Sequence, residues 1–225
     1  MLNLFSVNNT LFTLLNCSVS YIEFIGIIFT FMAAILIARA NIWSWLLSII
    51  GVCLYTFIFF QFKLYPDVVI QIMFLIANCY GWYKWSQDPV ILKNGNIITY
   101  SASIKERIIF AIAIVIGILV VGFIINDLNH MAPSLSDHPV SLPYADSSIA
   151  VIGLAATIWQ IRKCANAFIL WIINDAIIVV IYLIKNTPFV SLSYFVLLII
   201  AVRGLFNWLK LRKRYPVNNN KSIEI

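Results

Sequence analysis

Seven runs of mostly apolar residues follow one another along the chain, and they constrain its fold more than any other feature. A helix of about twenty apolar residues is long enough to cross the hydrocarbon core of a bilayer. The sequence therefore predicts an all-α integral membrane protein with seven transmembrane helices, at residues 21–38, 43–62, 66–85, 107–125, 147–162, 166–184 and 188–209. The fifth run is the shortest.

Composition supports the same class and argues against the alternatives. The chain is 62% hydrophobic and only 11% charged, whereas a soluble domain is about 25% charged. Its net charge of +6 comes from short basic clusters beside the apolar runs, not from a basic amphipathic stripe, which argues against nucleic-acid binding. The four cysteines form no CxxC pair or disulfide framework.

Loop lengths divide the seven runs into groups of three, one and three. Short connections join the first three runs and the last three, while longer polar loops at 86–106 and 126–146 flank the fourth. We therefore expect an N-terminal segment, a three-helix repeat, a linker that contains one helix, a second three-helix repeat and a basic tail. These parts are residues 1–20, 21–85, 86–146, 147–209 and 210–225.

Basic residues predict the orientation in the membrane. If the N-terminus is outside, the outward connections keep only Lys63 and Lys185, and the outward loop 126–146 has no Lys or Arg. Lys and Arg accumulate in cytoplasmic connections of membrane proteins. The inward connections and tail then carry Arg39, Lys84, Lys93, Lys105, Arg107, Arg162, Lys163, Lys210, Arg212, Lys213, Arg214 and Lys221. The pattern predicts an external N-terminus and a cytoplasmic C-terminus.

The third and seventh runs end on the same pattern, a glycine followed four positions later by a tryptophan. The pairs are Gly81 with Trp85 and Gly204 with Trp208, and a polar side chain precedes each glycine by ten residues. Interfacial tryptophans and helix-packing glycines would explain each pair alone. Because the matches recur in order, they indicate two parallel three-helix repeats, an arrangement that places a transporter's substrate site between the halves near the midplane.

Polar and aromatic side chains recur on single faces of several runs. Residues spaced by three, four or seven lie on one side of a helix, and such sets could converge inside the bundle. Interhelical hydrogen bonding is the alternative explanation, and we prefer it for Ser48. The residues predicted to line a substrate site are Trp45, Tyr55, Gln71, Asn78, Trp171, Asn174, Asp175 and Tyr194.

Asp175 carries the prediction of ligand chemistry. A carboxylate at membrane depth needs a cation, hydrogen-bond donors or water, and indole and phenol rings attract cations through their faces. No Lys or Arg lies near mid-membrane to receive a phosphate. The residues therefore favour an unphosphorylated, polar, aromatic ligand, with a cation the best match to Asp175. A hydrogen bond from Asp175 to a neighbouring helix remains the alternative.

Three stretches resemble the PnuC family of bacterial vitamin transporters. They are Asn41-Ile-Trp-Ser-Trp45, Leu64-Tyr-Pro-Asp67 leading to Gln71, and Tyr80-Gly-Trp-Tyr-Lys-Trp85. The second half is similar in a weaker way, and the connection at 185–189 departs from the family's Gly-Leu-Tyr turn. The resemblance covers roughly residues 21 to 214.

The resemblance implies a fold and a function. The fold is a three-plus-one-plus-three homotrimer in the bacterial inner membrane. The function is facilitated diffusion of an unphosphorylated B-vitamin precursor, trapped by cytoplasmic phosphorylation, with no coupling ion and no cofactor. Nicotinamide riboside, a precursor in NAD biosynthesis, is the first expected substrate; thiamine and riboflavin are the alternatives.

Two other functional classes have weaker support. One is a seven-helix photoreceptor or signalling receptor, but retinal attachment needs a lysine in the last run, and residues 188–209 contain none. A membrane enzyme could use a metal held by His130 and His138 with Asp127 and Asp137, but these residues lack helical ligand spacing and fit a solvated loop. Neither a metal nor catalysis is therefore expected.

Overall fold

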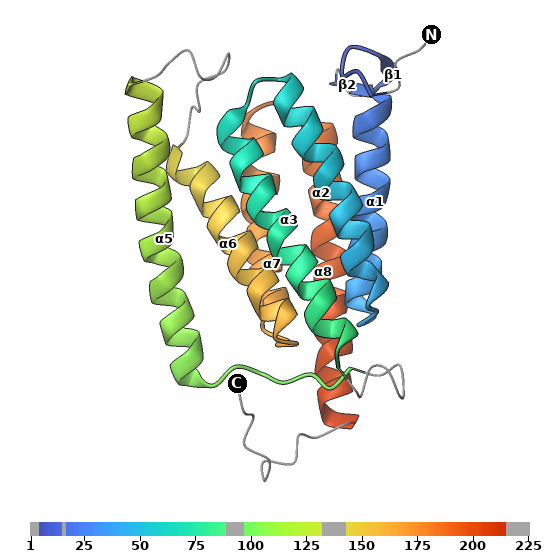
Figure 1. Ribbon diagram of the computed structural model, residues 1–225, viewed down its shortest axis with the longest axis vertical. Coiled ribbons are helices and arrows are strands. Elements are labelled where there is room, and N and C mark those ends of the chain that lie inside the picture. The colour runs from blue at the N-terminus through green and yellow to red at the C-terminus, as the bar shows by residue number, and fades with distance from the viewer. Residues whose placement is uncertain (1–4, 15–16, 89–96, 132–142, 215–225) are drawn as a thin grey trace.

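The computed structural model describes residues 5–14, 17–88, 97–131 and 143–214. These residues form seven long helices, α1 (Tyr21–Ala38), α2 (Trp43–Gln61), α3 (Tyr65–Ser86), α5 (Ile104–Met131), α6 (Pro143–Ile161), α7 (Ala167–Ile184) and α8 (Pro188–Arg214). Successive helices run up and down between two ends of the bundle (Figure 1). We call the end where α1 begins the hairpin end, and the end where residues 97–103 run the linker end.

Each of the seven apolar runs is a helix in the structure, as predicted. α3 exceeds its predicted bounds by one residue at each end, and three helices extend further beyond theirs. α5 runs from 104 to 131 rather than from 107 to 125, and α6 begins at Pro143 rather than at 147. α8 continues to Arg214, so that the first residues of the predicted tail are helical. These additions are polar or charged turns that continue the backbone hydrogen bonding past the apolar run, and proline is favoured in a first helical turn.

Five of the described helices are both long and apolar enough to cross a membrane, namely α1, α2, α5, α7 and α8. α3 and α6 fall short in hydropathy, yet they run between the same two ends (Figure 1). Both carry polar side chains that face the interior of the bundle, such as Asn78, Ser147 and Gln160, which are all buried. Polar groups that pack inside a bundle lower the mean hydropathy of a helix without exposing it to lipid.

A β-hairpin precedes α1, which the all-α prediction missed. Strands β1 (Thr10–Leu14) and β2 (Cys17–Ser20) pair antiparallel. Ser20 then caps α1, because its backbone N–H donates to Glu23 Oε2 at 2.7 Å and Glu23 N donates to Ser20 Oγ at 3.4 Å. Strands of four and five residues are too short for alternating polarity to stand out from the sequence.

Two sets of three helices make up the body of the bundle. In the first set α1 packs on α2 and α2 on α3; in the second set α6 packs on α7 and α7 on α8. Contacts of α1 with α8 and of α3 with α6 join the sets, while α5 packs against α6 at the edge (Figure 1).

The short turns of the two sets share an unusual backbone conformation. Ala40 and Lys63 follow α1 and α2 with positive φ angles of 57° and 56°; Lys163 and Asn186 follow α6 and α7 with 62° and 53°. Each residue of the second pair stands 123 positions after its counterpart (163 − 40 and 186 − 63). Non-glycine residues rarely adopt this region.

Candidate functional site

A cavity of about 370 Å³ lies between the two sets, lined by residues of all six of their helices and by none of α5. This volume is in the range of small-molecule sites. The structure brings all eight residues of the predicted site to this one cavity: Trp45, Tyr55, Gln71, Asn78, Trp171, Asn174, Asp175 and Tyr194. Ser48, which we had assigned to helix packing, lines it as well.

α7 contributes the acidic part of the lining. Asn174 and Asp175 are 3% and 4% exposed, and helical spacing places them next to Trp171, one turn earlier. The Asp175 carboxylate makes no ion pair or hydrogen bond with the described residues. The Asn174 Oδ1 and Trp171 Nε1 atoms are also buried without a described partner. Buried polar atoms are normally paired, so these groups are available to a polar ligand or to water.

α3 contributes two amides. Gln71 and Asn78 lie on the cavity side, and Asn78 Nδ2 donates to the Phe74 carbonyl at 2.8 Å, which leaves the Asn78 carbonyl oxygen for another partner. Trp82, which shares their face by spacing, does not line the cavity. Its ring packs edge-to-face on Trp43 with centroids 5.5 Å apart. The helix face is therefore divided between the cavity and the packing of α3 on α2.

α2 contributes aromatic rings held by glycines of neighbouring helices. Trp45 is 2% exposed, and its Nε1 atom has no described partner. A Cβ added to Gly81 would lie 2.5 Å from the Trp45 ring, and one added to Gly26 would lie 3.4 Å from Tyr55. Tyr55 therefore serves both the packing of α1 on α2 and the lining of the cavity. Ser44, a lining residue that we did not predict, also has an unpaired buried hydroxyl.

Charged residues lie at the hairpin end of the cavity, and none of them was among the residues predicted to line the site. Asp67 and Asp146, in the first turns of α3 and α6, both line it. Lys185 Nζ lies 3.9 Å from Asp146 Oδ1 and 5.7 Å from the centroid of the Tyr182 ring. Tyr182 in turn stacks on Tyr194, with centroids 6.4 Å apart and rings 7° from parallel. Asp67 belongs to one of the stretches that resemble the family, but an acidic residue in a first helical turn is common, so neither Asp67 nor Asp146 was assigned to the site from the sequence.

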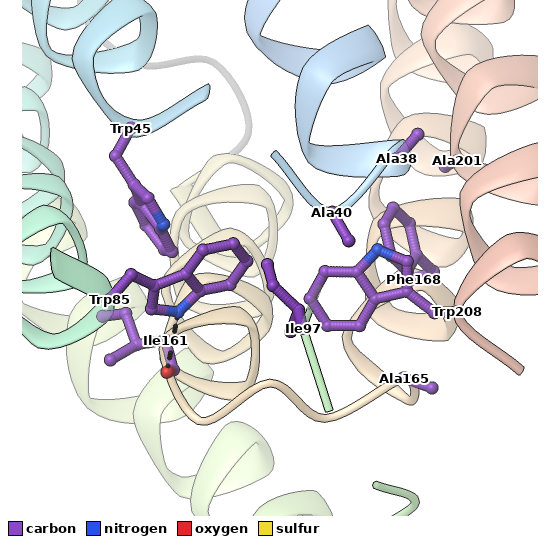
Figure 2. Packing of buried hydrophobic residues seen from close by; sticks show 10 residues of the cluster. All are labelled: Ala38, Ala40, Trp45, Trp85, Ile97, Ile161, Ala165, Phe168, Ala201 and Trp208. Atoms are coloured by element: carbon purple, nitrogen blue, oxygen red, sulfur yellow. Dashed lines mark hydrogen bonds between the residues drawn. The ribbon is translucent and has the colours of Figure 1, made fainter. Parts of the chain in front are cut away.

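The linker end of the cavity is closed by aromatic rings. Trp45 and Phe168 line the cavity and also belong to a buried cluster with Trp85 and Trp208, which are both 0% exposed (Figure 2). Trp45 lies 5.3 Å from Trp85, and Phe168 lies 5.1 Å from Trp208, centroid to centroid. The matching Gly–Trp pairs of the sequence therefore lie at one end of one cavity.

The described residues offer no constellation for a metal. They contain no group of three or more His, Cys, Asp and Glu side chains that could hold an ion. The alternative metal residues of the outer loop, the His130 side chain with Asp137 and His138, lie outside the described part. No Lys or Arg is among the lining residues of the cavity, so its electrostatic character comes from its carboxylates and from the faces of its aromatic rings.

A bundle of apolar helices around a central cavity that contains polar and aromatic side chains is typical of a small-molecule membrane transporter. Known proteins agree with this class. The family model described as "Nicotinamide mononucleotide transporter" matches residues 20–210. The nicotinamide riboside transporter PnuC of Escherichia coli (strain K12) is 30% identical over 206 residues, which cover 84% of this chain and 85% of that protein. The chain therefore belongs to the nicotinamide mononucleotide transporter family and is a membrane transporter, not an enzyme.

More distant similarities also extend over most of the chain. The riboflavin/roseoflavin transporter RibM of Streptomyces davaonensis is 22% identical and covers 90% of this chain and 91% of its own. The crystal structure of the vitamin B3 transporter PnuC has a TM-score of 0.69 at 20% identity, over 86% of this chain and 83% of that one. That likeness establishes the fold.

Proposed function

We propose that this protein carries an unphosphorylated B-vitamin precursor, first of all nicotinamide riboside, across the membrane by facilitated diffusion. The observation that carries the proposal is the cavity lining, which combines one buried carboxylate, several aromatic rings and amides with no Lys or Arg. Nicotinamide riboside is an aromatic cation with hydroxyl groups, so the carboxylate balances its charge, the rings stack on it and the amides bind its hydroxyls.

The absence of Lys and Arg from the lining supports one of the two nicotinamide ligands over the other. The family description names a mononucleotide, which bears a phosphate, whereas the relatives from Escherichia coli and Shigella flexneri are named nicotinamide riboside transporters. Proteins bind phosphate through Arg, Lys or clustered backbone N–H groups. A lining that carries carboxylates and no Lys or Arg supports the riboside.

Seven spans in a three-plus-one-plus-three order, with the two sets as parallel repeats, complete the proposed architecture. The constant separation of 123 residues between the positive-φ turns supports it. So does the packing of Gly81 on Trp45 and of Gly204 on Phe168, since both members of the second pair also stand 123 positions after their counterparts. Relative movement of the two sets would then open the cavity to either side.

The proposed orientation places the N-terminus outside the bacterial inner membrane and the C-terminus in the cytoplasm. Among the described residues, Lys84, Lys105, Arg107, Arg162, Lys163, Lys210, Arg212 and Lys213 gather at the linker end. A fluorescent protein fused to the C-terminus should fold and fluoresce in a bacterial host; a dark fusion at normal expression would contradict this orientation.

A homotrimer and metabolic trapping complete the proposal. The trimer rests on the family resemblance, and native mass spectrometry of the purified protein tests it, since a monomer mass alone would contradict it. Phosphorylation of the substrate in the cytoplasm would keep its free concentration low and so sustain inward diffusion. Loss of net uptake in cells that lack the kinase, with exchange of substrate retained, is the expected result.

A binding panel tests the substrate. We expect purified protein to bind nicotinamide riboside, and Asp175→Asn to weaken this binding by roughly 10- to 100-fold, the effect of losing a buried contact to a charged group. Isothermal titration calorimetry measures the affinities. Asp127→Asn, which neutralises an exposed carboxylate of α5 that does not line the cavity, is the matched control and should bind as the parent does.

Riboflavin is the second candidate, because a relative that covers most of the chain is named for it. Riboflavin is neutral, so Asp175→Asn should change its affinity little. Tight riboflavin binding with no response to nicotinamide riboside or thiamine would replace the proposed substrate. Unchanged affinity for nicotinamide riboside in Asp175→Asn would remove Asp175 from the site.

A further inference from the structure

The segment of residues 97–103, which we call the strap, completes the closure of the cavity at the linker end. Ile97 is 1% exposed and lies between the indole rings of Trp85 and Trp208 (Figure 2). These two rings have centroids 6.1 Å apart and come from α3 and α8, one from each set. Ile97 therefore fills the gap between the two sets directly beyond the rings that line the cavity.

Hydrogen bonds fix the strap to the second set. Thr99, which is 0% exposed, donates from Oγ1 to the Trp208 carbonyl at 2.8 Å. Tyr100 pairs with the turn between α6 and α7 through its N–H to the Lys163 carbonyl at 3.2 Å and its carbonyl from the Ala165 N–H at 2.8 Å. The Ala102 N–H donates to Asn166 Oδ1 at 2.9 Å. The strap thus belongs mechanically to the second set.

Two indole hydrogen bonds, one in each direction, also join the two sets at this end. Trp85 Nε1 donates to the Ile161 carbonyl of α6 at 3.1 Å (Figure 2), and Trp208 Nε1 donates to the Ile37 carbonyl of α1 at 2.9 Å. Each indole therefore donates to a carbonyl in the last turn of a helix of the other set, α6 for Trp85 and α1 for Trp208. Any separation of the sets at this end must break both bonds and withdraw Ile97 from between the rings.

We propose that the strap is part of the transport gate, with Ile97 as the side chain that seals the linker end and Thr99 as the residue that holds it in place. This rests on the proposed passage of substrate between the two sets. The strap moves with the second set, and the path to this side of the membrane is open when Ile97 has left the rings. Ile97 and Thr99 are positioning residues, since neither lines the cavity.

Thiol accessibility tests the gate. Ala201 lines the cavity and belongs to the same buried cluster, so Ala201→Cys reports on access from this side. Cys17, Cys53 and Cys79 are replaced by Ala, so that Cys164 is the one native cysteine left. The same protein without Ala201→Cys measures the background labelling of Cys164. A membrane-impermeant thiol reagent is applied to the face that carries the strap, and the labelling rate is measured.

We expect Ile97→Ala and Thr99→Val, each added to this protein, to raise the labelling rate by about two- to tenfold, because the closed state loses one buried contact. Ile98→Ala is the matched control: Ile98 is 36% exposed, and its variant should label at the parent rate. Thr99→Val keeps the side-chain shape, so it decides the question if Ile97→Ala fails to fold.

The affinity for nicotinamide riboside, measured on the same variants, separates this inference from the proposed substrate. The role of the strap would be overturned if a folded Thr99→Val protein were labelled at the parent rate, or if Ile98→Ala accelerated labelling equally. Neither result would affect the proposed substrate. Faster labelling with no binding of nicotinamide riboside in any variant, the parent included, would support the gate and overturn the substrate.

Discussion

At the scale of single residues, glycines decide where the large aromatic rings of the cavity lie. A Cβ on Gly81 would meet three atoms of the Trp45 ring at 2.5 to 2.7 Å, and one on Gly204 would meet Phe168 at 2.3 to 2.8 Å. Real Cβ atoms do not approach rings so closely, so each ring occupies space that only glycine leaves open. Both rings also line the cavity, which couples the packing of the helices to the shape of the site.

Gly81→Ala should therefore destabilise the protein, while Gly51→Ala should not. Both variants gain the helix propensity of alanine, but a Cβ on Gly51 meets its nearest neighbour at an ordinary 3.6 Å. We expect Gly81→Ala to be less stable than Gly51→Ala by about 1–3 kcal/mol, the usual effect of overpacking. Thermal unfolding in detergent measures the difference; equal melting temperatures would show that the Trp45 ring moves aside freely.

At the scale of helices, the hydropathy of each helix reflects whether it faces lipid or other helices. α5 is the most apolar candidate span and the least buried, with large exposed side chains along its length such as Ile112, Ile116 and Phe123. α6, by contrast, buries about half of its residues, polar ones included. A helix that contacts lipid must be apolar on its surface, whereas a helix surrounded by protein can carry the polar groups of a site.

A charge on α5 should be tolerated at its end but not at its middle. We expect Ile116→Lys to reduce the amount of folded protein in the membrane, because a lysine at the centre of a span costs about 2.5–3.5 kcal/mol on insertion. Ile104→Lys is the control, since Ile104 is 74% exposed at the first residue of α5 and its ammonium can reach the interface. Quantitative detection of the protein in membrane fractions compares them; equal yields would place α5 away from lipid.

At the scale of the whole molecule, one cavity between two sets of helices is the proposed basis of transport. The sets meet through α1 with α8 and α3 with α6, and the two indole hydrogen bonds lie at one end of these contacts. Asp146 and Lys185 lie at the other end. A cavity whose linker end is held shut by contacts between two bodies is suited to opening on that side when the bodies separate.

Transport should follow the substrate gradient alone. At zero membrane potential, we expect liposomes that contain the protein to take up nicotinamide riboside until inside and outside concentrations are equal, because a potential would itself drive a cation. The rate should be unchanged when ionophores collapse proton and sodium gradients. Empty liposomes give the leak, and Asp175→Asn should reduce uptake at low substrate concentration. Accumulation that depends on an imposed proton or sodium gradient would contradict facilitated diffusion and would point to coupling.

Much of the fold was predictable because it depends on local sequence. The seven apolar runs predicted the seven helices, and the spacing of Trp171, Asn174 and Asp175 placed them together on the cavity side. The hairpin before α1 and the polar extensions of α5 and α8 were missed, because short strands and charged helical turns leave weak periodic signals. Trp82 shares a face with Gln71 and Asn78 by spacing, yet it packs on Trp43, because spacing defines a helix face and not what packs against it.

The sequence by itself determined that the chain crosses a membrane, which segments are helical and which polar side chains lie at membrane depth, because these depend on hydropathy and helical period within about twenty residues. Only the tertiary structure decided which helices meet and what closes the cavity. The contacts that decide it join residues far apart in sequence: Thr99 bonds to Trp208, 109 positions away, and Trp208 to Ile37, 171 positions away. Such pairings arise from the packing of whole helices, so no local pattern around Ile97 could reveal that it seals the site.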